Sequence, residues 1–110
     1  MADPRVAGYA EALFAVAAAE GDSSVVEDEL FRFAQALRSD DDLGSTLADT
    51  GLPLARRLQV IEDLLGSRAS AVTTALVSMV VGAGRAAELP AIVDAMVERG
   101  AASRNKTVAT

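Results

Sequence analysis

The chain has 110 residues, enough for one domain with its own hydrophobic core. It contains no cysteine and no histidine, which excludes disulfides and removes the commonest general base and metal ligand. The net charge of −6 opposes binding to nucleic acids and to anionic membranes. The N-terminus lacks the features of a signal peptide, and no segment is long and apolar enough to span a membrane. We therefore expect a cytosolic protein with neither a cofactor nor a metal.

The first predicted helix runs from Pro4 to about Glu20. Asp3 can cap it, proline suits a first helical position, and Gly21 is a typical stop. Its core stripe, at spacings of three and four, comprises Val6, Tyr9, Ala10, Leu13, Phe14 and Ala17. A second, shallow apolar surface comprises Tyr9, Ala12, Leu13 and Val16. The alternative for this second surface is that alanine serves only as a helix former facing solvent.

Two helices are expected next. Ser24 and Glu27 have the spacing of a capping box, and the amphipathic pattern that follows ends near Arg38. The run 39–42 has one serine and three aspartates, and it fits the cap of a short helix. A cation site is disfavoured because the run lacks the glycine and the distant glutamate of a calcium-binding loop. The short helix ends at Thr50-Gly51.

A fourth helix is predicted from Pro53 to Gly66. Its apolar face comprises Leu54, Leu58, Ile61, Leu64 and Leu65. Charged residues such as Arg56 and Glu62 mark the side of this helix that faces solvent.

The segment 69–84 carries no charge and predicts a fifth helix. Ser67 or Ser70 caps it, and Gly82 and Gly84 end it. Its predicted core stripe comprises Val72, Ala75, Leu76, Met79 and Val80. A helix that is apolar nearly all round is buried on several sides. We therefore place it at the centre of a bundle, with some apolar surface left for a partner.

The last predicted helix has Pro90 in its first turn and ends at Arg99-Gly100. Its apolar stripe comprises Leu89, Ile92, Val93, Met96 and Val97. The tail is polar and then β-leaning. We therefore assign residues 1–102 to a helical domain and residues 103–110 to the start of a linker towards a missing C-terminal domain. Six helices with short connections predict an all-α six-helix bundle.

No group of residues supports catalysis. The acidic pairs lie on predicted solvent faces, and the glycines near residue 84 lack the strand and the GK[ST] sequence of a phosphate-binding loop. A roomy interior for a small molecule is disfavoured by the alanine-rich core. What remains is binding to another protein. If the first and fifth helices pack side by side, their surplus apolar surfaces form a groove for an amphipathic helix, unless packing within the bundle consumes these surfaces.

Three segments carry a family resemblance. Residues 9–17, YAEALFAVA, match the pattern YAxALFxxA, and residues 84–92, GRAAELPAI, are similar to the pattern NGRLxxLPxI. The tail 105–110, NKTVAT, is similar to the segment in which the same family runs into xAxVxSAxPL. In order and spacing these segments resemble the delta subunit of the bacterial rotary ATP synthase, whose mitochondrial relative is the oligomycin-sensitivity-conferring protein. Ala83 and Ala86 depart from the asparagine and leucine usual in that family.

The resemblance implies a non-catalytic stator on the cytoplasmic side of the bacterial membrane. It implies that an alpha subunit docks its N-terminal helix on the first and fifth helices, and that a b-type peripheral stalk subunit binds the missing C-terminal part. The groove residues it implies are Tyr9, Ala12, Leu13, Val16, Met79, Val80 and Ala83. It leaves open whether the full-length protein is a separate subunit or is fused to a stalk protein. The alternative function is a stand-alone helical interaction adaptor that self-associates through the same surface.

Overall fold

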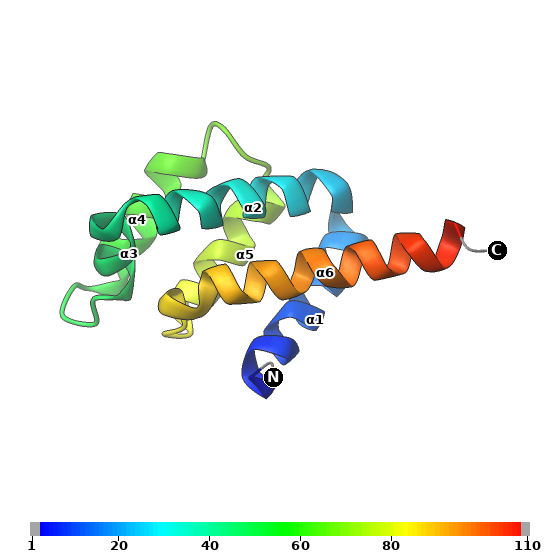
Figure 1. Cartoon of the computed structure of the whole chain (residues 1–110). Coiled ribbons are helices and arrows are strands. Elements are labelled where there is room, and N and C mark those ends of the chain that lie inside the picture. Colours follow the sequence, from blue (N-terminus) through cyan, green and yellow to red (C-terminus); the bar gives the residue numbers. More distant parts are fainter. Residues whose placement is uncertain (1–2, 109–110) are drawn as a thin grey trace.

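The structure, a computed structural model, describes residues 3–108, with side chains as far as residue 103, and the regular structure of this part is entirely helical. The elements are α1 (Pro4–Glu20), α2 (Ser23–Ser39), α3 (Asp41–Ala48), α4 (Leu54–Leu65), α5 (Ala71–Gly82), the 3-10 turn η1 (Ala86–Glu88) and α6 (Leu89–Val108). The predicted all-α six-helix bundle is confirmed (Figure 1).

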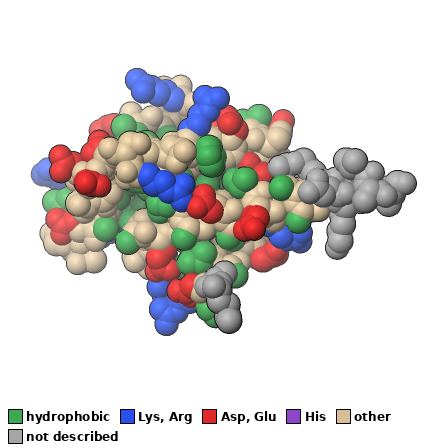
Figure 2. Space-filling model, viewed as in Figure 1, with side chains coloured by type: hydrophobic (Ala, Val, Ile, Leu, Met, Phe, Trp, Pro, Cys, Tyr) green, Lys and Arg blue, Asp and Glu red, His purple; other side chains and the backbone are tan. Residues whose placement is uncertain are grey.

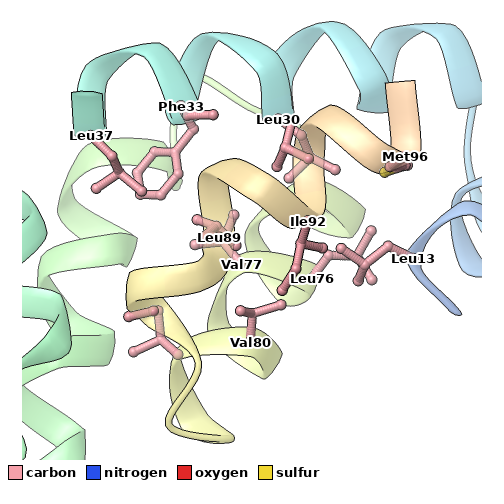
Figure 3. Close-up of a cluster of buried hydrophobic side chains, with 14 of the residues drawn as sticks. Leu13, Leu30, Phe33, Leu37, Leu76, Val77, Val80, Leu89, Ile92 and Met96 are labelled. Atoms are coloured by element: carbon pink, nitrogen blue, oxygen red, sulfur yellow. The ribbon is translucent and has the colours of Figure 1, made fainter. Parts of the chain in front are cut away.

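The core lies where α1, α2, α5 and α6 meet. α2 and α6 run alongside each other in opposite directions, and α1 packs mainly against α6 (Figure 1). Figure 3 shows apolar side chains from these four helices pointing towards one another. Those labelled there are Leu13, Leu30, Phe33, Leu37, Leu76, Val77, Val80, Leu89, Ile92 and Met96. The first and last helices of the chain therefore share one core with α5.

The surface formed by α2 and α6 carries both charged and hydrophobic side chains (Figure 2). Figure 2 shows acidic and basic side chains scattered between small groups of hydrophobic ones. Arg38 of α2 pairs with Asp94 of α6 at 2.5 Å, and Arg99 of α6 pairs with Glu11 of α1 at 2.5 Å. Exposed pairs of this kind add little stability each, so apolar burial is what holds these helices together.

Side-chain caps begin several helices, as the sequence predicts. The Asp3 carboxylate accepts the N–H of Arg5 at 2.8 Å, and Pro4 occupies the first position of α1. Asp40 accepts the N–H of Leu43 at 3.1 Å, so the acidic run does cap α3. The predicted capping box of α2 is wrong, because the helix begins earlier, at Ser23.

Asp22 is the residue that caps α2. Its carboxylate accepts the N–H groups of Ser24 at 3.1 Å and Val25 at 3.4 Å, together with the Ser24 hydroxyl at 2.8 Å. The hydroxyl of Ser24 is the main cause that holds the pKa of Asp22 below its ordinary value, and the N–H of Val25 adds to it. An ionised carboxylate is a stronger acceptor than a serine hydroxyl, so the cap forms at Asp22, two residues before the predicted cap Ser24.

The predicted end of the last helix at Gly100 is also wrong, because α6 continues to Val108. Gly100 is buried, and a Cβ added there would meet the buried carboxylate of Glu27. The absence of a side chain at Gly100 therefore leaves room for the Glu27 carboxylate of α2 beside α6, and the glycine does not end the helix. Residues 103–108 are helical and not β-leaning, whereas residues 109–110 lie outside the described part. The assignment of 103–110 to a linker stays a prediction.

Candidate partner-binding face on α1 and α5

Helices α1 and α5 lie side by side, as predicted. Gly21, at the end of α1, lies against Val72 near the start of α5, where an added Cβ would be 3.4 Å from the valine Cγ2. Tyr9, in the first half of α1, interacts with Arg85, which follows the end of α5. The two helices therefore run in opposite directions along each other.

Each of the two helices presents apolar residues to solvent. On α1, Ala12 is exposed and Tyr9 and Val16 are half-buried. On α5, Met79 is 45% exposed and Ala75 is exposed. Half-buried Val72 and exposed Ala83 extend the stripe of α5 in both directions. We call this set of surface residues the α1/α5 face, and its members are Tyr9, Ala12, Val16, Val72, Ala75, Met79 and Ala83.

Two predicted groove residues do not belong to this face. Leu13 and Val80 are fully buried and point into the core (Figure 3). Their side chains support the face from beneath and are unavailable to a partner in the folded chain. The predicted assignment of both residues to the lining is therefore wrong.

The predicted core stripe of α5 is confirmed for Leu76 and Val80 and wrong for Ala75 and Met79, which are exposed. The side chains that are buried belong to Thr73, Leu76, Val77, Val80 and Val81. Ala75 and Met79 turn away from the core, and Val72 is half-buried and packs at its edge, so the helix is rotated relative to the expectation. Val72 and Ala75 thus join the accessible face although the sequence pattern placed them inside.

A carboxylate from α2 holds the start of α5. Glu29 accepts the backbone N–H of Ser70 at 3.1 Å, the Ser70 hydroxyl at 2.9 Å and the Thr73 hydroxyl at 2.7 Å. Burial alone would raise the pKa of Glu29, but the hydrogen bonds from Thr73 and Ser70, with help from Arg32, place it below its ordinary value. The ionised carboxylate therefore fixes the N-terminal turn of α5 and complements the positive end of its dipole.

The other end of α5 is fixed by a turn and an ion pair. Gly84 has a φ of +78°, a conformation that favours glycine. The guanidinium of Arg85 donates to Glu88 at 2.8 Å. The pKa of Arg85 is raised, first by the hydrogen bond to Glu88 and also by Tyr9. The interaction between Arg85 and Tyr9 joins the turn after α5 to the first half of α1, at one edge of the α1/α5 face.

The described residues form neither a membrane-spanning helix nor a metal-binding cluster. None of the described helices combines the length and the apolar character that crossing a membrane requires. Within the same residues, no three acidic, histidine or cysteine side chains gather in a way that could hold a metal ion.

The fold and the α1/α5 face define a helical bundle with an apolar surface on two adjacent helices, a kind of surface on which protein partners dock. The family model described as "ATP synthase delta (OSCP) subunit" matches residues 6–110. The chain therefore belongs to the ATP synthase delta (OSCP) subunit family.

Relatives with this name cover most of the chain. The "ATP synthase subunit delta" of Salinispora tropica is 36% identical over 98 residues, which are 89% of this chain and 36% of the relative. The protein of the same name from Nocardia farcinica is 36% identical over 99% of this chain and 40% of the relative. The "ATP synthase subunit b-delta" of Mycobacterium sp. (strain KMS) is 34% identical over 89% of this chain and 22% of the relative.

The chain thus spans about two fifths or less of the length of these relatives. They include proteins named as a separate delta subunit and proteins named as a b-delta subunit. No solved structure matches the chain.

Proposed function

We propose that this domain is a stator component of the rotary proton-translocating ATP synthase, on the cytoplasmic side of the bacterial membrane. It receives the N-terminal helix of an alpha subunit on the α1/α5 face and so links the catalytic head to the peripheral stalk. It performs no catalysis itself. The family membership supports the complex, and the name b-delta of one group of relatives supports the link to a b-type stalk subunit. That link belongs to a C-terminal part beyond this chain.

The observation that carries the proposal is the pair of apolar stripes on adjacent helices. Alanines at positions 12, 75 and 83 allow the backbone of a docked helix to come close. Met79 is the largest exposed apolar side chain of the face, and its flexible thioether adapts to the shape of a partner. Burying a fully exposed side chain of this size contributes about 1.5–3 kcal/mol, and roughly half of this is available to a partner because Met79 is 45% exposed.

The test is a titration of the chain with a peptide that copies the first ~20–25 residues of the cognate alpha subunit, long enough for several helical turns. We expect saturable amide shifts centred on α1 and α5. Saturable shifts centred on other helices would contradict the face assignment. Absence of binding, combined with a dimer in sedimentation at micromolar concentration, would favour the self-associating adaptor instead.

Met79→Asp is the matching variant. We expect it to weaken peptide binding by several kcal/mol, on the order of the cost of placing a charge in a desolvated apolar contact. Leu54→Asp on α4 is the control, because Leu54 is exposed to a similar degree, 40% against 45%, and lies outside the face. Equal losses in the two variants, or no loss in Met79→Asp with the fold intact, would remove Met79 from the binding face.

A further inference from the structure

A second apolar site lies away from the α1/α5 face. A groove of about 560 Å³ runs between α2 and the connection from α4 to α5. The α2 side of the groove is formed by one helical face, with residues at spacings of three and four from Val25 to Ala36. That stretch is roughly 16 Å long at the rise of an α-helix. The volume is within the range of small-molecule sites.

Two large apolar side chains at this groove are exposed. Val25 is 45% exposed and Leu64 is 37% exposed, although the sequence predicts Leu64 on the buried face of its helix. Phe33 and Leu65 line the same groove and are more deeply buried. An apolar ligand in the groove could therefore contact the more deeply buried side chains of Phe33 and Leu65 and cover the exposed ones of Val25 and Leu64.

The two ends of the groove differ chemically. At the end near the C-terminus of α2, the lining comes from Phe33, Ala36 and Leu43, which are apolar. Arg68 lies at the opposite end, because the neighbouring Ser70 donates its N–H to Glu29 in the first half of α2. A ligand that fills this groove therefore has an apolar end and a polar end.

The charges around the polar end are satisfied within the chain, with one exception. Asp28 pairs with Arg32 at 3.1 Å, and Glu29 accepts the hydrogen bonds that cap α5. Arg68 makes neither an ion pair nor a side-chain hydrogen bond with the side chains described from residue 3 to 103. Arg32, which lines the same groove, has Asp28 as its partner, whereas the Arg68 guanidinium has no partner among the described side chains. Its planar fork suits a carboxylate.

We propose that this groove binds a single-chain amphiphile with a carboxylate head, of the fatty-acid type, with the chain towards Leu43 and the carboxylate on Arg68. The ligand is the carboxylate anion dissolved in solution and not a lipid within a bilayer, because the net charge of −6 disfavours approach to an anionic membrane. The site is independent of the docking of a partner helix on the α1/α5 face.

The test is an amide-shift titration of the 110-residue chain with decanoate below its critical micelle concentration. We expect saturable shifts at the groove residues of α2 and around Arg68. Decanol and decyltrimethylammonium carry the same chain with a neutral and a cationic head, and we expect both to bind more weakly. Equal binding of all three would overturn the role of the carboxylate. Non-saturable shifts, or shifts of similar size on the α1/α5 face, would overturn the site.

Two variants separate the head from the chain. Arg68→Ala should weaken decanoate binding about tenfold and leave decanol binding unchanged. Ala36→Phe, at an exposed helical position inside the groove, should block both ligands by filling the apolar end. Arg56→Ala is the matched control, since Arg56 is exposed on α4 and does not line the groove. Equal losses in Arg56→Ala and Arg68→Ala would mean that only general charge acts, which overturns the proposal.

Discussion

The two glycines at the end of α5, the last helical residue Gly82 and Gly84 in the turn that follows, differ in their backbone conformation. Gly84 has a φ of +78°, whereas Gly82 ends the helix without a positive φ, and an added Cβ would meet nothing at either position. Gly84→Ala should therefore destabilise the fold by about 1–2 kcal/mol through backbone strain. Gly82→Ala should be neutral or stabilising by up to about 1 kcal/mol. Urea unfolding of the two variants measures both values, and equal effects would contradict this explanation.

Glu29 of α2 accepts hydrogen bonds from two residues at the start of α5, Ser70 and Thr73. Glu29→Gln removes the charge that holds Ser70 and Thr73 at the N-terminal turn of α5, and we expect a loss of about 1–2 kcal/mol at neutral pH. Because the folded-state pKa is lowered, the stabilisation is fully present above the ordinary glutamate value of 4.5 and is lost as the pH falls through the folded-state pKa. Urea unfolding from neutral to acid pH should therefore show the gap between variant and parent closing in acid.

Glu62→Gln is the control for this charge. Glu62 is exposed on α4 and caps no helix of the described chain. We expect the free energy of unfolding of Glu62→Gln to lie within about 0.5 kcal/mol of the parent value at neutral pH. A gap for Glu29→Gln that stays constant from neutral to acid pH would show that the contact acts by shape and not by charge.

At the scale of a single helix, the adjacent residues Ala12 and Leu13 of α1 lie on different sides, one facing solvent and one in the core. Leu13 is fully buried in the core, and Ala12 is exposed on the α1/α5 face. Leu13→Ala should cost about 2–5 kcal/mol of stability by leaving a cavity. Ala12→Glu should leave stability nearly unchanged and abolish binding of the alpha-subunit peptide. Thermal unfolding and the peptide titration together separate the two effects, and loss of stability in Ala12→Glu would contradict the assignment of this position to the surface.

The helix ends were predictable where one local residue decides them. Asp3 and Pro4 begin α1, and Ser70 caps α5 through the N–H of Thr73 at 3.3 Å. The rotation of α5 was not predictable, because every side of this helix is apolar and only its neighbours decide which side is buried. α1 has a clearer stripe, and its buried residues Val6, Ala10, Leu13 and Ala17 all belong to the predicted set. Periodicity therefore located the candidate face but could not select its members on α5.

At the scale of the whole molecule, contacts between residues far apart in the sequence determine features that the hydrophobic pattern of single helices could not predict. Glu29 and Ser70 are 41 positions apart in the sequence, and no local motif predicts the hydrogen bond between them. Gly100 after Arg99 has the sequence pattern of a helix stop, whereas its closeness to Glu27 depends on how α2 and α6 pack. The family resemblance supplied the pairing of α1 with α5 as an expectation, and the structure supplied the side chains that this pairing leaves accessible.

The helices do not contribute equally to the core, and this should appear in hydrogen exchange. On α4, Ile61 is the one fully buried side chain, while Leu54 and Leu64 are 40% and 37% exposed. α6 instead buries Leu89, Ile92, Val93 and Met96 completely. Local opening costs less where fewer apolar side chains leave the core. In native-state exchange at low denaturant, we expect the amides of α4 to exchange through a partial opening, well before those of α1, α2 and α6. Protection of α4 equal to that of α6 would show that the bundle opens only as one unit.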